Sequence, residues 1–207
     1  VTIFDLQSLD RTEISVPLCP SSGTCNYSVS QVVFDPGNLN IYIRAEGAKD
    51  IFQVAFTDLG PTGGSVGGND FRASLSMLAV GGLAADMSLY GTGKDTRLAV
   101  VAQDSKSLVI IDPSTSRSVS VALGMSASAI VPFSAPGPDP NDASPRSQAL
   151  LLDTRSGSAS VVFADLESVE TSGGLSLSSF SIRGPVDRVL PLVDQGIAIL
   201  LYRGSSG

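Results

Sequence analysis

Apolar side chains along this chain are collected in short runs, which are separated by glycine, proline, asparagine, aspartate and serine. Residues 117–123 and 175–182 alternate between serine and apolar residues, a pattern that is typical of a strand with one face in solvent. Residues 149–152 and 197–201 are continuously apolar, as expected of an inner strand that is covered on both faces. The pattern therefore predicts an all-β protein of short strands joined by turns.

No segment has the spacing of an amphipathic helix. The best candidate, residues 72–87, contains the pair Gly81 and Gly82 and lacks a clear polar face. A parallel sheet requires a long crossover, usually a helix, between consecutive strands. The pattern therefore excludes a βαβ fold and favours antiparallel sheets.

An apolar strand that ends in aspartate and then turns occurs four times. The aspartates are Asp5, Asp58, Asp112 and Asp165, so the intervals are 53, 54 and 53 residues. A short carboxylate at this place can accept hydrogen bonds from backbone N–H groups and set a turn. We therefore assign these aspartates to the turns of an internal repeat, in preference to a ring with a binding role.

Each repeat unit is predicted to contain four strands. The complete units cover residues 29–80, 84–124 and 128–183, and half units cover residues 1–18 and 186–203. The predicted strands are residues 1–6 and 11–18; 31–34, 39–44, 51–56 and 71–80; 86–90, 97–102, 108–112 and 118–123; 129–133, 148–153, 160–165 and 175–182; and 186–192 and 197–202.

Four-stranded units with this period resemble the blades of a β-propeller. Residues 108–117, in which a third strand ends in Asp112 and a Ser/Thr turn follows, are similar to propeller repeats of the YVTN and NHL type. The resemblance covers essentially the whole chain, although the chain lacks the tryptophan and the Gly-His pair of WD40 repeats. It implies an all-β propeller with four-stranded antiparallel blades, and residues 1–207 as one propeller domain or segment. A β-sandwich, the alternative, rarely keeps so even a period.

The two half units leave the number of blades open. The first half unit supplies a third and a fourth strand, and the last supplies a first and a second strand. If they pair, they close a ring of four blades and hide the free sheet edges. If they do not, the chain is an arc of a propeller with about six to eight blades. We favour the arc, because the chain opens in the middle of a predicted strand.

Composition and charge exclude several classes of protein. Apolar residues make up 43% of the chain and charged residues 16%, and the mean hydropathy is +0.25, which is too apolar for a disordered chain. The apolar runs are far shorter than the roughly 20 residues of a membrane-spanning helix. The net charge of -7 disfavours nucleic acid and anionic lipid as partners, because both require clustered lysine and arginine.

Cys19 and Cys25 enclose a short loop rich in serine, glycine and proline. Such a loop can bring the two sulfur atoms together, so we predict a local disulfide and a periplasmic, extracellular or cell-surface location. Two free thiols in a cytosolic protein are the alternative, and a zinc site is not expected because the chain contains no histidine. Residues 1–6 lack the cationic start of a signal peptide, so we expect a processed piece of a longer protein.

Two loops carry the candidate binding residues. The proline-rich loop at residues 136–145 offers oxygen ligands for calcium, but its spacing is not that of an EF-hand. The glycine-rich loop at residues 60–70 resembles a phosphate-binding loop, but no Gly-Lys-Ser/Thr follows it. We expect a rigid exposed loop and a flexible connection, respectively. The residues assigned to these candidate sites are Asp139, Asn141, Asp142, Asn69 and Asp70.

The absence of histidine excludes Ser-His-Asp, Cys-His and His-metal catalysis, and no catalytic residue is assigned. We therefore expect a non-catalytic propeller that acts as a scaffold or as a protein- or ligand-binding module, without a cofactor. A protein partner would bind through the loops at residues 17–26, 60–70 and 136–146. The alternative is a ligand-binding or hydrolytic propeller enzyme with an acidic, calcium-dependent site that is completed outside this chain. A structural segment of a larger surface assembly is a third interpretation.

Overall fold

The computed structural model of the chain describes residues 2–4, 13–19, 25, 27–58, 71–136, 145–154, 160–168, 177–192 and 197–202. Over these ranges the protein is all-β, and every predicted strand has a counterpart whose ends differ by a few residues. Helical residues within the same ranges are limited to the 3₁₀ turn η1 (Gly93–Asp95) and to residues 166–168.

The strands form antiparallel sheets in which neighbours in the sheet are also neighbours in the chain. The first sheet contains β3 (Ser28–Asp35), β4 (Asn40–Glu46), β5 (Asp50–Asp58) and β6 (Phe71–Ala79). The second contains β7 (Ala84–Tyr90), β8 (Arg97–Ala102), β9 (Ser107–Asp112) and β10 (Arg117–Ala122). The third contains β11 (Ala129–Pro136), β12 (Pro145–Leu152), β13 (Ser160–Asp165) and β14 (Leu177–Ser181). Two hairpins, β1 (Thr2–Phe4) with β2 (Glu13–Ser15) and β15 (Val186–Leu192) with β16 (Ile197–Tyr202), form two-stranded sheets.

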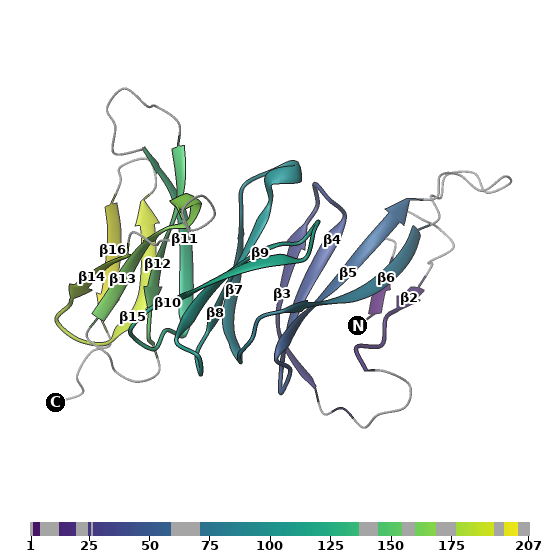
Figure 1. Cartoon of the computed structure of the whole chain (residues 1–207), viewed down its shortest axis with the longest axis horizontal. Coiled ribbons are helices and arrows are strands. Elements are labelled where there is room, and N and C mark those ends of the chain that lie inside the picture. Colours follow the sequence, from purple (N-terminus) through teal and green to yellow (C-terminus); the bar gives the residue numbers. More distant parts are fainter. Residues whose placement is uncertain are drawn as a thin grey trace, which may run out of the picture.

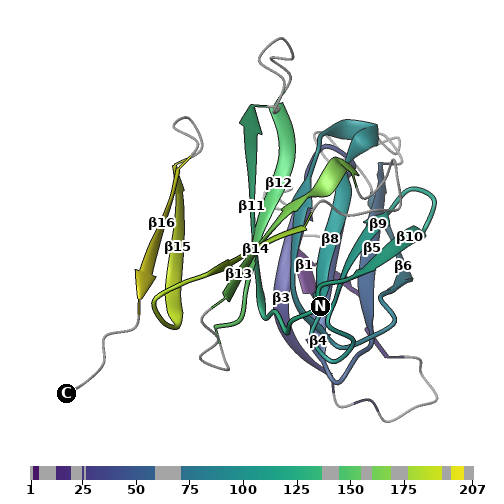
Figure 2. The same cartoon turned by 60° about the vertical axis from the view of Figure 1, so that its left-hand side comes forward.

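The sheets stand side by side in chain order along the long axis of the molecule (Figure 1). The hairpin β1–β2 lies beside the first sheet (Figure 1). The hairpin β15–β16 overlaps the third sheet in that view, and the second view shows it beyond the third sheet (Figure 2). The two hairpins therefore lie at opposite ends and belong to separate sheets. The strands that the structure describes form an open series of sheets and not a closed ring.

The second strand of each complete unit is buried on both faces, which explains its continuous apolar sequence. In β8, Leu98 and Val100 belong to the core between the first and second sheets. The intervening Ala99 and Val101 belong to the core between the second and third sheets. Each fully buried side chain of this size contributes about 1.5–3 kcal/mol to the free energy of unfolding. Alternate residues of one strand thus stabilise two different sheet–sheet contacts.

The first strands of neighbouring sheets contact one another, and Asp86 on β7 joins all three sheets. β7 contacts β3 on one side and β11 on the other. One Asp86 carboxylate oxygen accepts hydrogen bonds from Gln31 Nε2 on β3 at 2.7 Å and from the Met87 backbone N–H at 2.9 Å. The other oxygen accepts a hydrogen bond from the Ile130 backbone N–H on β11 at 3.0 Å. A single carboxylate on β7 therefore links the first strands of all three sheets.

The outer strands differ from the prediction. The alternation of serine and apolar residues in β10 and β14 predicted one covered face, but most positions on both faces of these strands are exposed. Both are edge strands. The continuously apolar β16 was expected to be covered on both faces, yet Ile197, Ile199 and Leu201 are exposed. These differences arise because burial depends on the neighbouring sheet, which the pattern within one strand does not specify.

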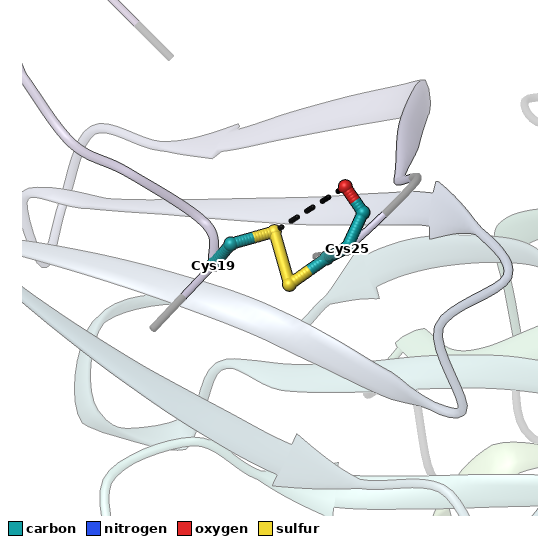
Figure 3. Close-up of a disulfide and its surroundings, with 2 residues drawn as sticks. All are labelled: Cys19 and Cys25. Atoms are coloured by element: carbon teal, nitrogen blue, oxygen red, sulfur yellow. Dashed lines mark hydrogen bonds between the residues drawn. A yellow bond between two sulfur atoms is a disulfide. The ribbon is translucent and has the colours of Figure 1, made fainter. Parts of the chain in front are cut away.

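A disulfide joins Cys19 and Cys25 in the segment that follows β2, as the short loop between them predicts (Figure 3). The two Cα atoms are 6.0 Å apart. The Cys19 sulfur lies 3.8 Å from the carbonyl oxygen of Cys25, the contact drawn as a dashed line. In the chain-entropy account, closing so short a loop contributes roughly 2 kcal/mol to stability.

Candidate functional site

Most of the predicted site residues lie outside the residues that the structure describes. These are the loop residues Asn69, Asp70, Asp139, Asn141 and Asp142, together with the repeat aspartate Asp5. Asp58 is the last residue of β5, and the position of its side chain is not described. Asp112 and Asp165 are the repeat aspartates whose side chains can be placed.

Asp112, at the end of β9, accepts hydrogen bonds from the backbone N–H and the hydroxyl of Ser114 at 2.9 and 2.6 Å. A guanidinium nitrogen of Arg97 on β8 lies 3.7 Å from its other oxygen. Burial acts to raise the pKa of Asp112, but the hydrogen bonds from Ser114 and Thr115 and the Arg97 charge outweigh it and lower the pKa below 3.8. The ionised carboxylate thus holds the turn after β9.

Asp165, at the end of β13, has a similar environment. It accepts hydrogen bonds from the backbone N–H groups of Glu167 and Ser168 at 3.2 and 3.3 Å. Arg146 on β12 donates to it at 3.5 Å. In both units an arginine of the second strand contacts the aspartate of the third strand, an ion pair that the sequence analysis did not include.

A polar pocket of about 120 Å³ lies between the first and second sheets. Its wall joins the turn between β3 and β4, the segment around η1 and the turn after β9. The lining residues are Asp35, Asn38, Asn40, Tyr42, Gly93, Lys94, Thr96, Pro113 and Ser114. None of these residues was singled out by the sequence analysis.

Asn38 links the two sheets across the pocket. Its side-chain nitrogen donates to Asp35 Oδ2 at 2.8 Å within the first sheet. The same nitrogen donates to the Gly93 carbonyl oxygen at 2.8 Å and lies 3.3 Å from the Thr96 hydroxyl in the second sheet. Asp35 is only 6% exposed, and its other hydrogen bond comes from the backbone N–H of Asn38 at 3.3 Å. Among the residues placed in the structure, Asp35 has no ion pair.

Tyr42 on β4 is fully buried, and its ring belongs to the core between the first and second sheets. Its hydroxyl has no hydrogen bond of regular geometry to any described part of the chain. Burial, together with the negative charges of Asp35 and Asp112, raises the pKa of Tyr42 to about 12, although a hydrogen bond with the Asn40 side chain acts to lower it. An unpartnered buried hydroxyl costs about 1–3 kcal/mol. The hydroxyl is therefore a neutral polar group directed at the pocket.

A larger hollow of about 460 Å³ lies between the end of β6 and the outer strands of the second sheet. Its lining residues are Ala79, Val80, Gly81, Ser105, Ser107, Val109, Ser118, Ser120 and Ala122. This lining offers hydroxyl groups but no charged side chain. The smaller pocket carries the stronger chemistry, because it combines a buried carboxylate with an unpartnered hydroxyl.

The Tyr42 hydroxyl keeps its proton in the polar pocket. Tyr42 holds its proton too tightly to act as a base near neutral pH. No group of three or more Cys, Asp and Glu side chains that could hold a metal ion occurs in the described ranges. In those ranges there is also no helix with the length and apolar character to cross a membrane.

Comparison with protein-family models, with curated proteins and with solved structures finds no match for this chain. Inferences about its function therefore rest on its own residues.

Proposed function

We propose that this chain is a non-catalytic scaffold and binding module of the β-propeller type, with blades of the YVTN and NHL kind. The observation that carries the proposal is the series of four-stranded sheets whose first strands are in contact and whose second strands are buried on both faces. A radial arrangement of blades requires both features. The polar pocket between two of these sheets supports the binding role.

An exported or surface-exposed location forms part of this proposal. Its support is the disulfide between Cys19 and Cys25, because disulfides persist in oxidising compartments. Blocking free thiols in freshly isolated native protein and then counting reducible cysteines tests it. Two protected cysteines are expected, whereas two blocked thiols would contradict the proposed location.

Thermal unfolding tests the binding role. The melting temperature is measured with calcium and with a chelator, and then with neutral, anionic and cationic small molecules. We expect a saturable rise with at least one organic class, because a ligand that binds only the folded state stabilises it. A rise that depends on calcium would favour the alternative of an acidic, calcium-dependent enzyme. No rise with any compound would contradict the proposed ligand-binding role.

A further inference from the structure

Most of the residues that line the polar pocket carry a side-chain oxygen: Asp35, Asn38, Asn40, Tyr42, Thr96 and Ser114. The Asp35 carboxylate accepts two hydrogen bonds from described residues, both from Asn38, although a carboxylate has about four acceptor positions. It is buried and has no basic partner in the described part of the chain. Asp112 adds a second negative charge, which contributes to the raised pKa of Tyr42, but the ion pair with Arg97 offsets that charge. The buried wall thus retains an unbalanced carboxylate with capacity for further N–H donors.

The Tyr42 hydroxyl is an independent sign of a ligand. It belongs to a side chain with 0% exposure, and among the described atoms only the Asn40 side chain interacts with it, without a hydrogen bond of regular geometry. Tyr42 lines the pocket together with Asp35 and Asn40. Because a neutral hydroxyl can accept or donate a hydrogen bond, it can complete a site that begins at Asp35.

We infer that this pocket binds a primary ammonium group, with Asp35 as the counter-charge and the Tyr42 hydroxyl as acceptor of one of its N–H bonds. This inference rests on the proposed binding role. An ammonium group has three N–H donors and no acceptor, which complements an oxygen-rich wall. At about 30 Å³ for each water molecule, the 120 Å³ pocket has room for a head group of a few heavy atoms.

Two sources can supply this chemistry, a free small amine or the end of a lysine side chain in a partner protein. The chain's own Lys94 lies at the mouth of the pocket and is exposed. Its ammonium group competes with an incoming cation by repulsion. We therefore expect Lys94→Met to bind a small amine at least as tightly as the unaltered chain.

Nuclear magnetic resonance of a chain with ¹³C-labelled tyrosine rings provides the test. The chain has four tyrosines, and Tyr42→Phe assigns the Tyr42 signal. The protein is titrated with methylammonium chloride and, in a separate sample at equal ionic strength, with tetramethylammonium chloride. Both cations carry one positive charge, but only methylammonium has N–H donors. We expect a saturable shift of the Tyr42 signal with methylammonium only. A lysine blocked at both its amino and carboxyl ends is titrated in parallel: tighter binding than methylammonium indicates a protein side chain, and weaker binding a free amine.

Variants separate the site from a general charge effect. Asp35→Asn is expected to weaken methylammonium binding by about tenfold or more, which corresponds to about 1.4 kcal/mol. The exposed Asp95→Asn is the matched control and should bind as the unaltered chain does. Tyr42→Phe, followed by calorimetry, should weaken binding several-fold without lowering the melting temperature of the free protein, because it removes an unpartnered hydroxyl.

An equal response to tetramethylammonium, or no response in both the unaltered chain and Lys94→Met, would overturn the inference. If only a neutral or anionic compound stabilises the protein in the unfolding test, the binding role stands and the ammonium site is wrong. If no compound stabilises it, both are wrong.

Discussion

Tyr42 and Asp35 show how a repeat built for burial can leave polar atoms at the edge of its core. Tyr42 occupies a continuously buried stretch of β4, where its ring packs like the aliphatic side chains beside it. Tyr42 and Asp35 both line the polar pocket. The pocket therefore combines one long aromatic side chain in an inner strand with one aspartate at the end of β3.

Tyr42 makes stability fall at high pH. Its pKa is about 12 in the folded protein, against an ordinary value of 10.0 that applies to the unfolded chain. The unfolded chain loses this proton first, so stability that is fully present below pH 10 is lost as the pH rises toward about 12. Urea unfolding at pH 9 to 11.5 should show a steeper loss in the unaltered chain than in Tyr42→Phe. Identical pH dependence in the two proteins would contradict the burial of this hydroxyl.

In the part of the chain that the structure describes, three turns end in a non-glycine residue with left-handed backbone conformation, which favours glycine. These residues are Leu39, Lys106 and Ser116, with φ of 51°, 49° and 57°. We expect Ser116→Gly to stabilise the protein by up to about 1 kcal/mol, as measured by chemical unfolding, because it relieves this strain. Ser118→Gly, within β10, is the control and should destabilise it, since glycine weakens a strand. Destabilisation by both substitutions would argue against the turn geometry.

At the scale of elements, the contact among first strands depends on polar groups as well as on apolar packing. The Asp86 carboxylate receives donors from β3 and β11, which are separated along the chain by the rest of the first sheet and the whole of the second. Gln31 also donates to the Met87 carbonyl oxygen at 2.9 Å and accepts from its N–H at 3.1 Å. The sheets are therefore joined at their inner edges by a network that involves backbone groups.

Asp86→Ala removes the acceptor that this network shares. The Ile130 backbone N–H and one donor of Gln31 lose their partner, and we expect a loss of about 2–4 kcal/mol in the free energy of unfolding. Urea unfolding measures this loss. Asp95→Ala on the exposed η1 turn serves as the control and should change stability by less than about 0.5 kcal/mol. Similar values for the two variants would show that Asp86 does not join the sheets.

The strands could be predicted from the sequence because apolar runs and turn residues mark them locally. The pocket could not, because Asn38 contacts Gly93 and Thr96 from 55 and 58 residues away. These separations are close to the repeat period, so equivalent parts of consecutive units are neighbours in space. The repeat period therefore predicts that consecutive units are in contact, but it does not predict which side chains form the contacts. The ion pairs of Arg97 and Arg146 could not be predicted for the same reason, because the register between neighbouring strands determines which side chains are opposite one another.

At the scale of the whole molecule, burial is greatest in the inner strands of the complete units and low in the hairpin β15–β16, as it is in the edge strands β10 and β14. Strands β8 and β9 are almost entirely buried, whereas one face of the hairpin exposes apolar side chains. These are Leu190, Leu192, Ile197, Ile199 and Leu201, at 41–52% exposure. Stability within a protein varies in the same sense as such burial.

Hydrogen exchange should follow this gradient. We expect the backbone amides of β8 and β9 to exchange slowest and those of β15 and β16 much faster, as measured by mass spectrometry of peptic fragments. Equal protection of the inner strands and this hairpin would contradict the burial gradient.

The central claim, that inner strands are covered on both faces by neighbouring sheets, is tested most directly by thiol accessibility. Ala99→Cys and Val100→Cys place single thiols at adjacent positions of β8 that are 0% exposed. Ser118→Cys and Val119→Cys do the same on the exposed β10. The native cysteines are joined in a disulfide, so each variant has one free thiol. Both β8 thiols should resist a maleimide reagent in the native protein, and both β10 thiols should react. Reaction at one of the two β8 positions would mean a strand with one face in solvent, as in a simple β-sandwich, and would contradict the account.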